Sequence, residues 1–446
     1  MIDALSSSNA FCRAPVRKAT NAAQMKNPGR WRGWLLCLLL VVLYTPKVRL
    51  PGDIPVRIDD VLVFSAGGVL AVKYLLGFQT PKLDAVFLYT VVLTGTILLS
   101  TLLAPSNLGV TAKEYLDCLR PIKFFFVYWL IRDSHPATAL STFIRVLSGA
   151  SFILFAIACI EMFFARTMPG GAVVRFFSSF TEKSPDLLLD MMASRPFATF
   201  NTPPELGYLA CVCLFAGPFI HRALLRKLVV ATFFLVLLIT ATRMLLFSLP
   251  LLMILQAFLK SKTAREAFRR LRMNLALIAL AAVSSVVLLP LMSPHASDFT
   301  QSMIVSVVSG DTKDEDSITT RLGNLYLVDY TQSRAPLIGV GSRALLPEFV
   351  DSELILTFHR YGFIGLSLLL FIYPLGFVMA RRIAGENPEL YQFAVMALAT
   401  TFLCGITLGA LDNSRTGVFI FIILGLVRGA KECESGNVKG LVPSLG

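Results

Sequence analysis

The sequence has few charged residues and none of the common enzyme signatures. Only 15% of its 446 residues are Asp, Glu, Lys or Arg, whereas 55% are hydrophobic. A soluble core of this length does not need so much apolar surface, which argues against a soluble globular protein. The chain also lacks a Walker loop, a nucleophile-elbow pattern and a His-Glu-x-x-His motif. We therefore expect neither a metal nor a nucleotide cofactor.

The eight cysteines do not have the pattern of a disulfide framework. Most of them lie in or beside apolar runs, where cysteine behaves as a small buried hydrophobic residue. Cys211 and Cys213 stand too close together, in apolar surroundings, to predict a zinc site. The adjacent carboxylates Asp59 and Asp60 are likewise weak evidence for a metal. The sequence shows no internal repeat and no second soluble domain.

Long apolar runs are the main feature that the sequence does have. Runs of about twenty residues recur throughout, and each is long enough to cross a hydrocarbon core of about 30 Å. We therefore predict an all-α polytopic membrane protein with about twelve transmembrane helices. The predicted spans centre on Leu38, Phe64, Val92, Phe125, Phe155, Cys211, Phe234, Leu251, Leu280, Leu370, Leu398 and Phe421. The first span is short, and Arg120, Pro121 and Lys123 interrupt the fourth.

Basic residues between the spans predict their orientation. Several basic segments fall on one side of the predicted arrangement: residues 221–227, residues 260–272, Arg381 with Arg382, and Arg428 with Lys431. The positive-inside rule places this side, and both termini, in the cytoplasm. The net charge of +13 then reflects topology and contact with anionic membrane lipid, and we expect no nucleic acid as a partner.

The order of spans and loops divides the chain into segments. We expect a basic cytoplasmic tail over residues 1–32, spans one to nine over 33–292, a large far-side loop over 293–361, spans ten to twelve over 362–430, and a cytoplasmic tail over 431–446. Residues 166–203 form another long far-side loop between spans five and six.

The large loop contains signals of its own structure. Helical spacing relates Ile318, Leu322, Leu325 and Val328. A tight turn is indicated by Pro336, Gly339 and Gly341. Pro347 can then open the next helix at its first position. We therefore expect a helical cap between spans nine and ten.

Arginine is frequent in the far-side loops, against the orientation rule. Arg243 lies in a hairpin with almost no loop between two apolar spans, and an isolated arginine near a membrane face is costly without an anionic partner. A guanidinium suits the geometry of a phosphate and keeps its charge at any working pH. Arg195, Arg243 and Arg321 are therefore candidates for an anion clamp. Two alternatives stay open: Arg243 can extend to lipid headgroups, and Arg321 can pair with the acidic residues 314–316.

Residues 350–365 contain the candidates for a general base. Asp351 and Glu353 stand at the polar start of a helix, and Gly362-x-x-Gly365 breaks it where a span begins. A carboxylate at the desolvated end of a membrane span can take a proton from an attacking hydroxyl group. Asp351 is therefore the first candidate for the general base and Glu353 the second. Both also suit the charge preference of a helix N-terminus. His359 is a third candidate, although a lone histidine at such a position is more often a packing residue.

Taken in order, these segments resemble the O-antigen ligase and polymerase superfamily (Wzy/WaaL type). Residues 195–207 are similar to the family's box before the sixth span, and Thr242-Arg243 is similar to its Ser-Arg at a tight periplasmic hairpin. Residues 317–321, followed by 337–341, resemble the Arg helix and the Gly-x-Gly turn of its large periplasmic loop. Residues 351–365 resemble the box that closes this loop. Ligases of the superfamily usually carry His-Asn or His-Ser where this chain has Asp351-Ser352.

The resemblance implies an enzyme of the bacterial inner membrane whose active face is periplasmic. Its substrate would be a glycan linked through pyrophosphate to a polyprenol, held among membrane lipid, and a chain-length regulator and a flippase would be its partners. The departure at Asp351 favours a polymerase of exopolysaccharide or O-antigen repeat units. It would be a metal-independent, inverting glycosyltransferase in which a carboxylate activates the acceptor and arginines bind the pyrophosphate.

Two alternatives to a polymerase stay open. A ligase would transfer the glycan to lipid A core or to another acceptor. A polysaccharide transporter or flippase would need no catalytic base, and it would place charged residues in discontinuous spans near the membrane midplane. The polar groups of this chain cluster instead in one far-side region, which favours an enzyme.

Overall fold

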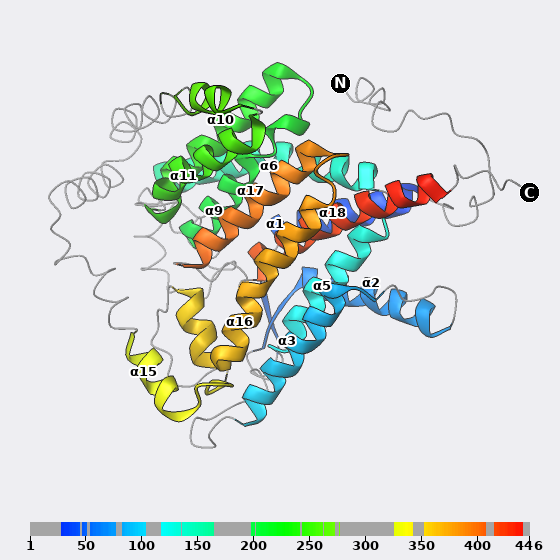
Figure 1. Ribbon diagram of the computed structural model, residues 1–446, viewed down its shortest axis with the longest axis vertical. Coiled ribbons are helices and arrows are strands. Elements are labelled where there is room, and N and C mark those ends of the chain that lie inside the picture. The colour runs from blue at the N-terminus through cyan, green and yellow to red at the C-terminus, as the bar shows by residue number, and fades with distance from the viewer. Residues whose placement is uncertain are drawn as a thin grey trace, which may run out of the picture.

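The computed structural model describes most of the predicted helical segments. The residues it describes are 28–44, 47–50, 54–76, 83–103, 117–134, 136–164, 198–200, 202–240, 243–261, 263–272, 276, 325–341, 352–406 and 414–439. Figure 1 shows that helices dominate these parts of the chain. They are α1 (Pro28–Tyr44), α2 (Ile58–Leu75), α3 (Ala85–Leu102), α5 (Leu119–Arg132), α6 (Pro136–Phe164), α9 (Pro203–Leu214), α10 (Ala223–Ile239), α11 (Arg243–Lys260), α15 (Leu325–Arg334), α16 (Glu353–Arg381), α17 (Pro388–Gly405) and α18 (Ser414–Lys439), with a short 3-10 turn, η4 (Gly217–Phe219).

The apolar composition of these helices indicates a helical membrane protein. Among the described residues, three helices are long and apolar enough to cross a membrane: Ala85–Leu102, Thr138–Glu161 and Glu353–Arg381. Two shorter helices, Gly33–Tyr44 and Ser248–Lys260, are also apolar. A described helix covers every predicted span centre except Leu280, which lies outside the described residues. The number of spans and the helical cap as a whole stay predictions.

A β-hairpin between α1 and α2 is a difference from the predicted all-α fold. Strand β1 (Lys47–Leu50) pairs antiparallel with β2 (Ile54–Arg57), and Val48 lies opposite Val56. Strand β2 runs directly into α2. Strands of four residues are too short to give a clear alternating pattern, so the sequence did not indicate them.

Helix α18 lies at the centre of the packed helices. Its residues from Val418 to Leu424 are all buried, as expected for a helix that is apolar on every face. It packs along α5 (Figure 1), and glycine lets the two backbones approach closely. A methyl group on Gly425 would lie 2.8 Å from the carbonyl oxygen of Tyr128, and one on Gly429 would lie 3.1 Å from that of Arg132.

A buried ionic network joins α3, α5 and α18 at the end of α5. Arg132 contacts Asp84 at 2.8 Å and Glu432 at 2.5 Å, and its side chain is 3% exposed. Asp84 is also the N-cap of α3, where it accepts hydrogen bonds from Val86 N and Phe87 N. One carboxylate thus caps a helix and pairs with a neighbouring one, which fixes the relative positions of α3 and α5.

Helix α16 begins later than the sequence predicted. Ser352 has an extended backbone and is the N-cap, and Glu353 is the first helical residue. The helix was expected to open at Pro347, which lies outside the described residues. Serine is among the strongest N-cap residues, and at this position its signal outweighs that of the earlier proline.

Candidate functional site

A turn after α15 packs against a break within α16. Gly362 has φ 63° and ψ −161°, which interrupts the helix as the Gly362-x-x-Gly365 pattern predicted. The predicted tight turn is also confirmed, because Gly339 and Gly341 both have positive φ. Backbone hydrogen bonds of 2.8–3.1 Å join the two segments: Val340 N to His359 O, Gly341 N to Arg360 O, Phe363 N to Pro336 O, and Ile364 N to Leu337 O.

Glycine is required where these two segments touch. A methyl group on Gly339 would lie 2.3 Å from the carbonyl carbon of Arg360, and one on Gly362 would lie 2.4 Å from that of Leu337. Both distances are far below van der Waals contact with backbone atoms, which cannot move aside easily. Ser100 of α3 adds a hydrogen bond of 2.5 Å to the oxygen of Arg360. The break in α16 is therefore held from two sides, which fixes the direction of the helical half that begins at Glu353.

The carboxylate of Glu353 lies inside the protein at the first turn of α16. Its side chain is buried, and a methyl group on Gly405 of α17 would lie 2.9 Å from Glu353 Oε2. The same methyl group on Gly405 would lie 3.5 Å from the hydroxyl oxygen of Tyr373, so the carboxylate and a tyrosine hydroxyl lie in the same part of the protein.

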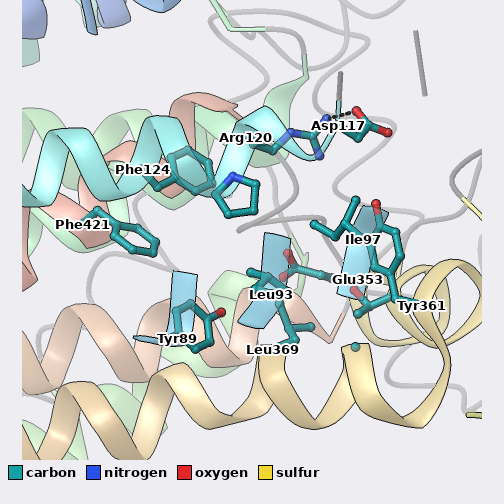
Figure 2. Close-up of a pocket in the computed structure, with 13 residues that line it drawn as sticks. Tyr89, Leu93, Ile97, Asp117, Arg120, Phe124, Glu353, Tyr361, Leu369 and Phe421 are labelled. Carbon is teal, nitrogen blue, oxygen red and sulfur yellow. Dashed lines mark hydrogen bonds and ion pairs between the residues drawn. The ribbon is translucent and has the colours of Figure 1, made fainter. Parts of the chain in front are cut away.

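Glu353 also lines a pocket between α3, α5, α16 and α18 (Figure 2). About 580 Å³ of this space, part of it open to the surroundings, is not filled by protein atoms. The polar end contains Asp117, Arg120, Glu353 and Tyr361, and Thr357 is a further polar lining residue. The other lining residues are Tyr89, Leu93, Ile97, Pro121, Phe124, Gly365, Leu369 and Phe421. The pocket is thus polar at one end and mostly apolar along its length.

Arg120 is the cation of this pocket. Its Nη2 lies 3.0 Å from Asp117 Oδ1, and the two side chains are 28% and 25% exposed. Arg120 belongs to the first turn of α5, and Cys118 at the N-cap makes no side-chain capping hydrogen bond. A guanidinium is therefore present at the more exposed end of the pocket.

One turn further along α5, a second cation is fully paired. Lys123 Nζ lies 2.5 Å from both Asp59 Oδ2 and Asp60 Oδ1, and its side chain is 2% exposed. The two aspartates that were weak evidence for a metal thus form an ion cluster with a lysine. No group of three metal-ligating side chains is found among the described residues.

Of the predicted site residues, the structure describes Glu353 most completely. Asp351, Arg195 and Arg321 lie outside the described residues. Arg243 begins α11, but its side chain is not described. The anion clamp and the role of Asp351 therefore stay predictions.

His359 lies in a packed contact and not in the pocket. It is fully buried, and its Nδ1 is 2.8 Å from the hydroxyl of Thr331 in α15. The ring also lies near that of Tyr330, with 6.2 Å between the centroids. The surroundings of His359 are those of a residue that joins α15 to α16, in agreement with the packing interpretation.

The described part of the 195–207 segment is held by buried polar contacts. Ala198 has φ 49°, and its N–H donates to Glu161 Oε2 of α6 at 2.8 Å. The hydroxyl of Thr199 donates to the carbonyl oxygen of Leu43 at the end of α1. This segment is therefore fixed against α1 and α6 just before α9 begins.

Arg120 and Asp117 are pocket residues that the sequence analysis did not select. The signal was present, because Arg120, Pro121 and Lys123 interrupt an otherwise apolar run. Such residues mark a functional site by default. In the sequence alone, they only weaken the prediction of the fourth span.

No known family model matches the chain, and no curated protein matches its sequence.

Proposed function

We propose that the protein is a membrane polymerase that joins polyprenyl-pyrophosphate-linked oligosaccharide repeat units at the periplasmic face. The observation that carries this proposal is the buried carboxylate of Glu353 in a pocket that has a cation at its polar end and an apolar interior. A lipid-linked sugar pyrophosphate needs these same three features, namely a base for the acceptor, a cation for the phosphates and an apolar surface for the lipid.

The proposed reaction is a direct displacement at the anomeric carbon. The carboxylate takes the proton of the acceptor hydroxyl as its oxygen forms a bond to the anomeric carbon. The bond from that carbon to the phosphate oxygen breaks, and polyprenyl pyrophosphate leaves with the electron pair. The anomeric configuration is therefore inverted. Base catalysis contributes about a hundred- to ten-thousand-fold, and fixed cations stabilise the charge of the leaving group.

The predicted orientation agrees with this use of the pocket. Helices α2, α5 and α16 correspond to predicted spans that all begin on the periplasmic side. Asp59, Arg120 and Glu353 belong to the first turns of these helices. Arg195, Arg243 and Arg321 are predicted on the same side, where they would bind the pyrophosphate together with Arg120.

The test is the length of polymer made by cells that carry Glu353→Gln. This change keeps the shape of the side chain and removes the base, and we expect loss of long polymer at normal protein abundance. Glu389→Gln is the matched control, because Glu389 is also in the first turn of a helix but is exposed and outside the pocket. If helix charge alone mattered, both variants would have the same effect.

Asp351→Asn decides between the two carboxylates. If Glu353→Gln makes polymer of normal length and Asp351→Asn makes none, Asp351 is the base. If neither change shortens the polymer, the proposed function is wrong. Purified protein supplied only with lipid-linked units separates polymerase from ligase, because a ligase forms no longer product without a second acceptor.

A further inference from the structure

A short helix over residues 264–272, just beyond the end of α11, has one strongly basic face. Arg265, Arg269 and Arg272 are exposed, and Phe268 is 66% exposed. Spacings of three, four and seven residues put these side chains on the same side of a helix. This basic face therefore combines three guanidinium groups with one exposed aromatic ring.

The opposite side of the helix is turned toward the protein. Ala267 is 3% exposed. Glu266 is the only acidic residue within 264–272, lies off the basic face by its spacing, and pairs with Arg270 at 2.6 Å. The N–H of Glu266 also donates to the hydroxyl of Thr263 at 3.3 Å, which holds the first turn. The helix thus buries one side and leaves its basic face outward.

Helix α11 places this basic face close to the membrane. It covers the predicted span centred on Leu251, and Leu251 and Phe258 are 59% and 57% exposed, as expected for side chains that contact lipid tails. Only residues 261–263 separate Lys260 from the short helix. An extended chain covers at most about 3.6 Å per residue, so the helix begins within about 15 Å of the end of α11.

The chemistry of the basic face fits the headgroup region of a bilayer. An aromatic ring surrounded by arginines has no apolar neighbour in water, whereas the boundary between headgroups and acyl chains accommodates aromatic rings. A guanidinium binds phosphate through paired hydrogen bonds, and the stem of an arginine can lie along apolar surface while its charged end reaches the phosphate. The charge complement of this face is an anionic phospholipid.

We propose that residues 264–272 lie along the membrane surface and bind an anionic phospholipid on the side predicted to be cytoplasmic. The guanidinium groups of the basic face contact the headgroup phosphate, and Phe268 lies among the first carbons of the acyl chains. This site is independent of the proposed function. It gives a location to the lipid contact that the net charge indicates only for the chain as a whole.

Lipid bound here would also act on the neighbouring helices. The side-chain amide of Gln392 in α17 donates to the carbonyl oxygen of Leu259 at 3.4 Å. The end of α11 is therefore joined to the first turns of α17. A lipid that holds residues 264–272 at the membrane surface fixes the level of both helices in the bilayer.

The experiment titrates the purified full chain in non-ionic detergent with phosphatidylglycerol and follows bound lipid by native mass spectrometry. We expect Arg265→Gln with Arg269→Gln to weaken the tightest binding at least about tenfold, because each arginine near an anionic lipid contributes roughly fivefold. Arg381→Gln with Arg382→Gln is the matched control, since it removes the same charge from two exposed residues at the end of α16 on the same predicted side. Its affinity should change less than about twofold.

The two double variants separate a site from a general effect of charge. Equal losses in both overturn the site, because net charge alone would then determine lipid binding. Unchanged affinity in Arg265→Gln with Arg269→Gln also overturns it. All four arginines are exposed, so thermal unfolding of both variants should match that of the unchanged chain.

Three further arms test the lipid itself. Phe268→Ala should weaken binding about threefold or more, whereas Phe152→Ala, at a 39% exposed position of α6, should not, and equal affinities of the two variants overturn the role of the ring. Phosphatidylcholine should bind at least about tenfold more weakly, and equal binding overturns the selectivity for anionic lipid. Inorganic phosphate should displace bound phosphatidylglycerol poorly. Efficient displacement would make this a phosphate site and overturn the lipid assignment.

Discussion

The two arginines at opposite ends of α5 have different surroundings. Arg120 pairs with Asp117 of its own helical turn, and its side chain is 28% exposed in a pocket. Arg132 pairs with Asp84 and Glu432 from two other helices, and its side chain is 3% exposed. A charge with distant, buried partners holds helices together. The pair between Arg120 and Asp117, in contrast, is local and partly accessible to solvent.

The same contrast distinguishes two residues of α16. Glu353 lines the pocket, whereas His359 is enclosed by the contact with α15 and bonded to Thr331. Both were candidates for a general base because both are polar residues of one short segment. Their environments differ although both are polar: Glu353, which lines the pocket, is the base that we propose, and His359 packs α15 against α16.

The largest expected effect is on stability, from Arg132→Gln. Removal of one member of a buried ionic network leaves a carboxylate without its cation, which typically costs about 3–5 kcal/mol. Arg120→Gln should cost less than about 1 kcal/mol, because its pair is accessible to solvent. Thermal unfolding of the two purified variants measures the difference. Equal losses of stability would show that the ion pair of Arg120 stabilises the fold as much as the ionic network of Arg132 does.

The next effect concerns the glycine contact at the break in α16. Gly339→Ala forces a methyl group against the backbone of Arg360 at a positive φ, and such strain costs about 1–3 kcal/mol. Gly95→Ala is the control, because that position in α3 has no atom within 4 Å of the added methyl group, and helical alanine is favoured over glycine. A melting temperature that falls only in Gly339→Ala supports the contact. Unchanged stability in Gly339→Ala would mean that the turn packs elsewhere.

A smaller change tests the position of the Glu353 carboxylate. Gly405→Ala adds a methyl group 2.9 Å from Glu353 Oε2 and should displace it by a few tenths of an ångström. We expect about a tenfold loss of polymer synthesis with little loss of stability, since small misplacements of reacting groups are costly. Gly149→Ala in α6 has no such neighbour and serves as the control. Normal synthesis by Gly405→Ala would argue against a catalytic role for Glu353.

Sequence alone predicted helices at the described span centres, the turn at Gly339 and Gly341, and the break at Gly362, but not the contact between the turn and the break. Apolar runs locate spans because length and hydropathy are local properties, and Gly339 and Gly362 stand out because positive φ favours glycine. The pocket was not predicted, because Arg120 and Asp117 meet Glu353 only after α5 and α16 pack together. The β-hairpin was missed because its strands have four residues each. The start of α16 was misplaced because Pro347 and Ser352 are competing start signals.

The smallest expected effect comes from Thr331→Val, which removes the hydrogen-bond partner of His359 while it keeps the shape of the contact. A buried hydrogen bond contributes about 0.5–1.5 kcal/mol, and we expect a loss of stability in that range. If His359 only joins α15 to α16, polymer length stays normal in the folded protein. If His359 is the base, its tautomer and ring orientation depend on Thr331, and synthesis falls much more than stability does. Measurement of polymer length and thermal unfolding on the same preparation decides between these outcomes. A selective loss of synthesis would move the catalytic role from Glu353 to His359.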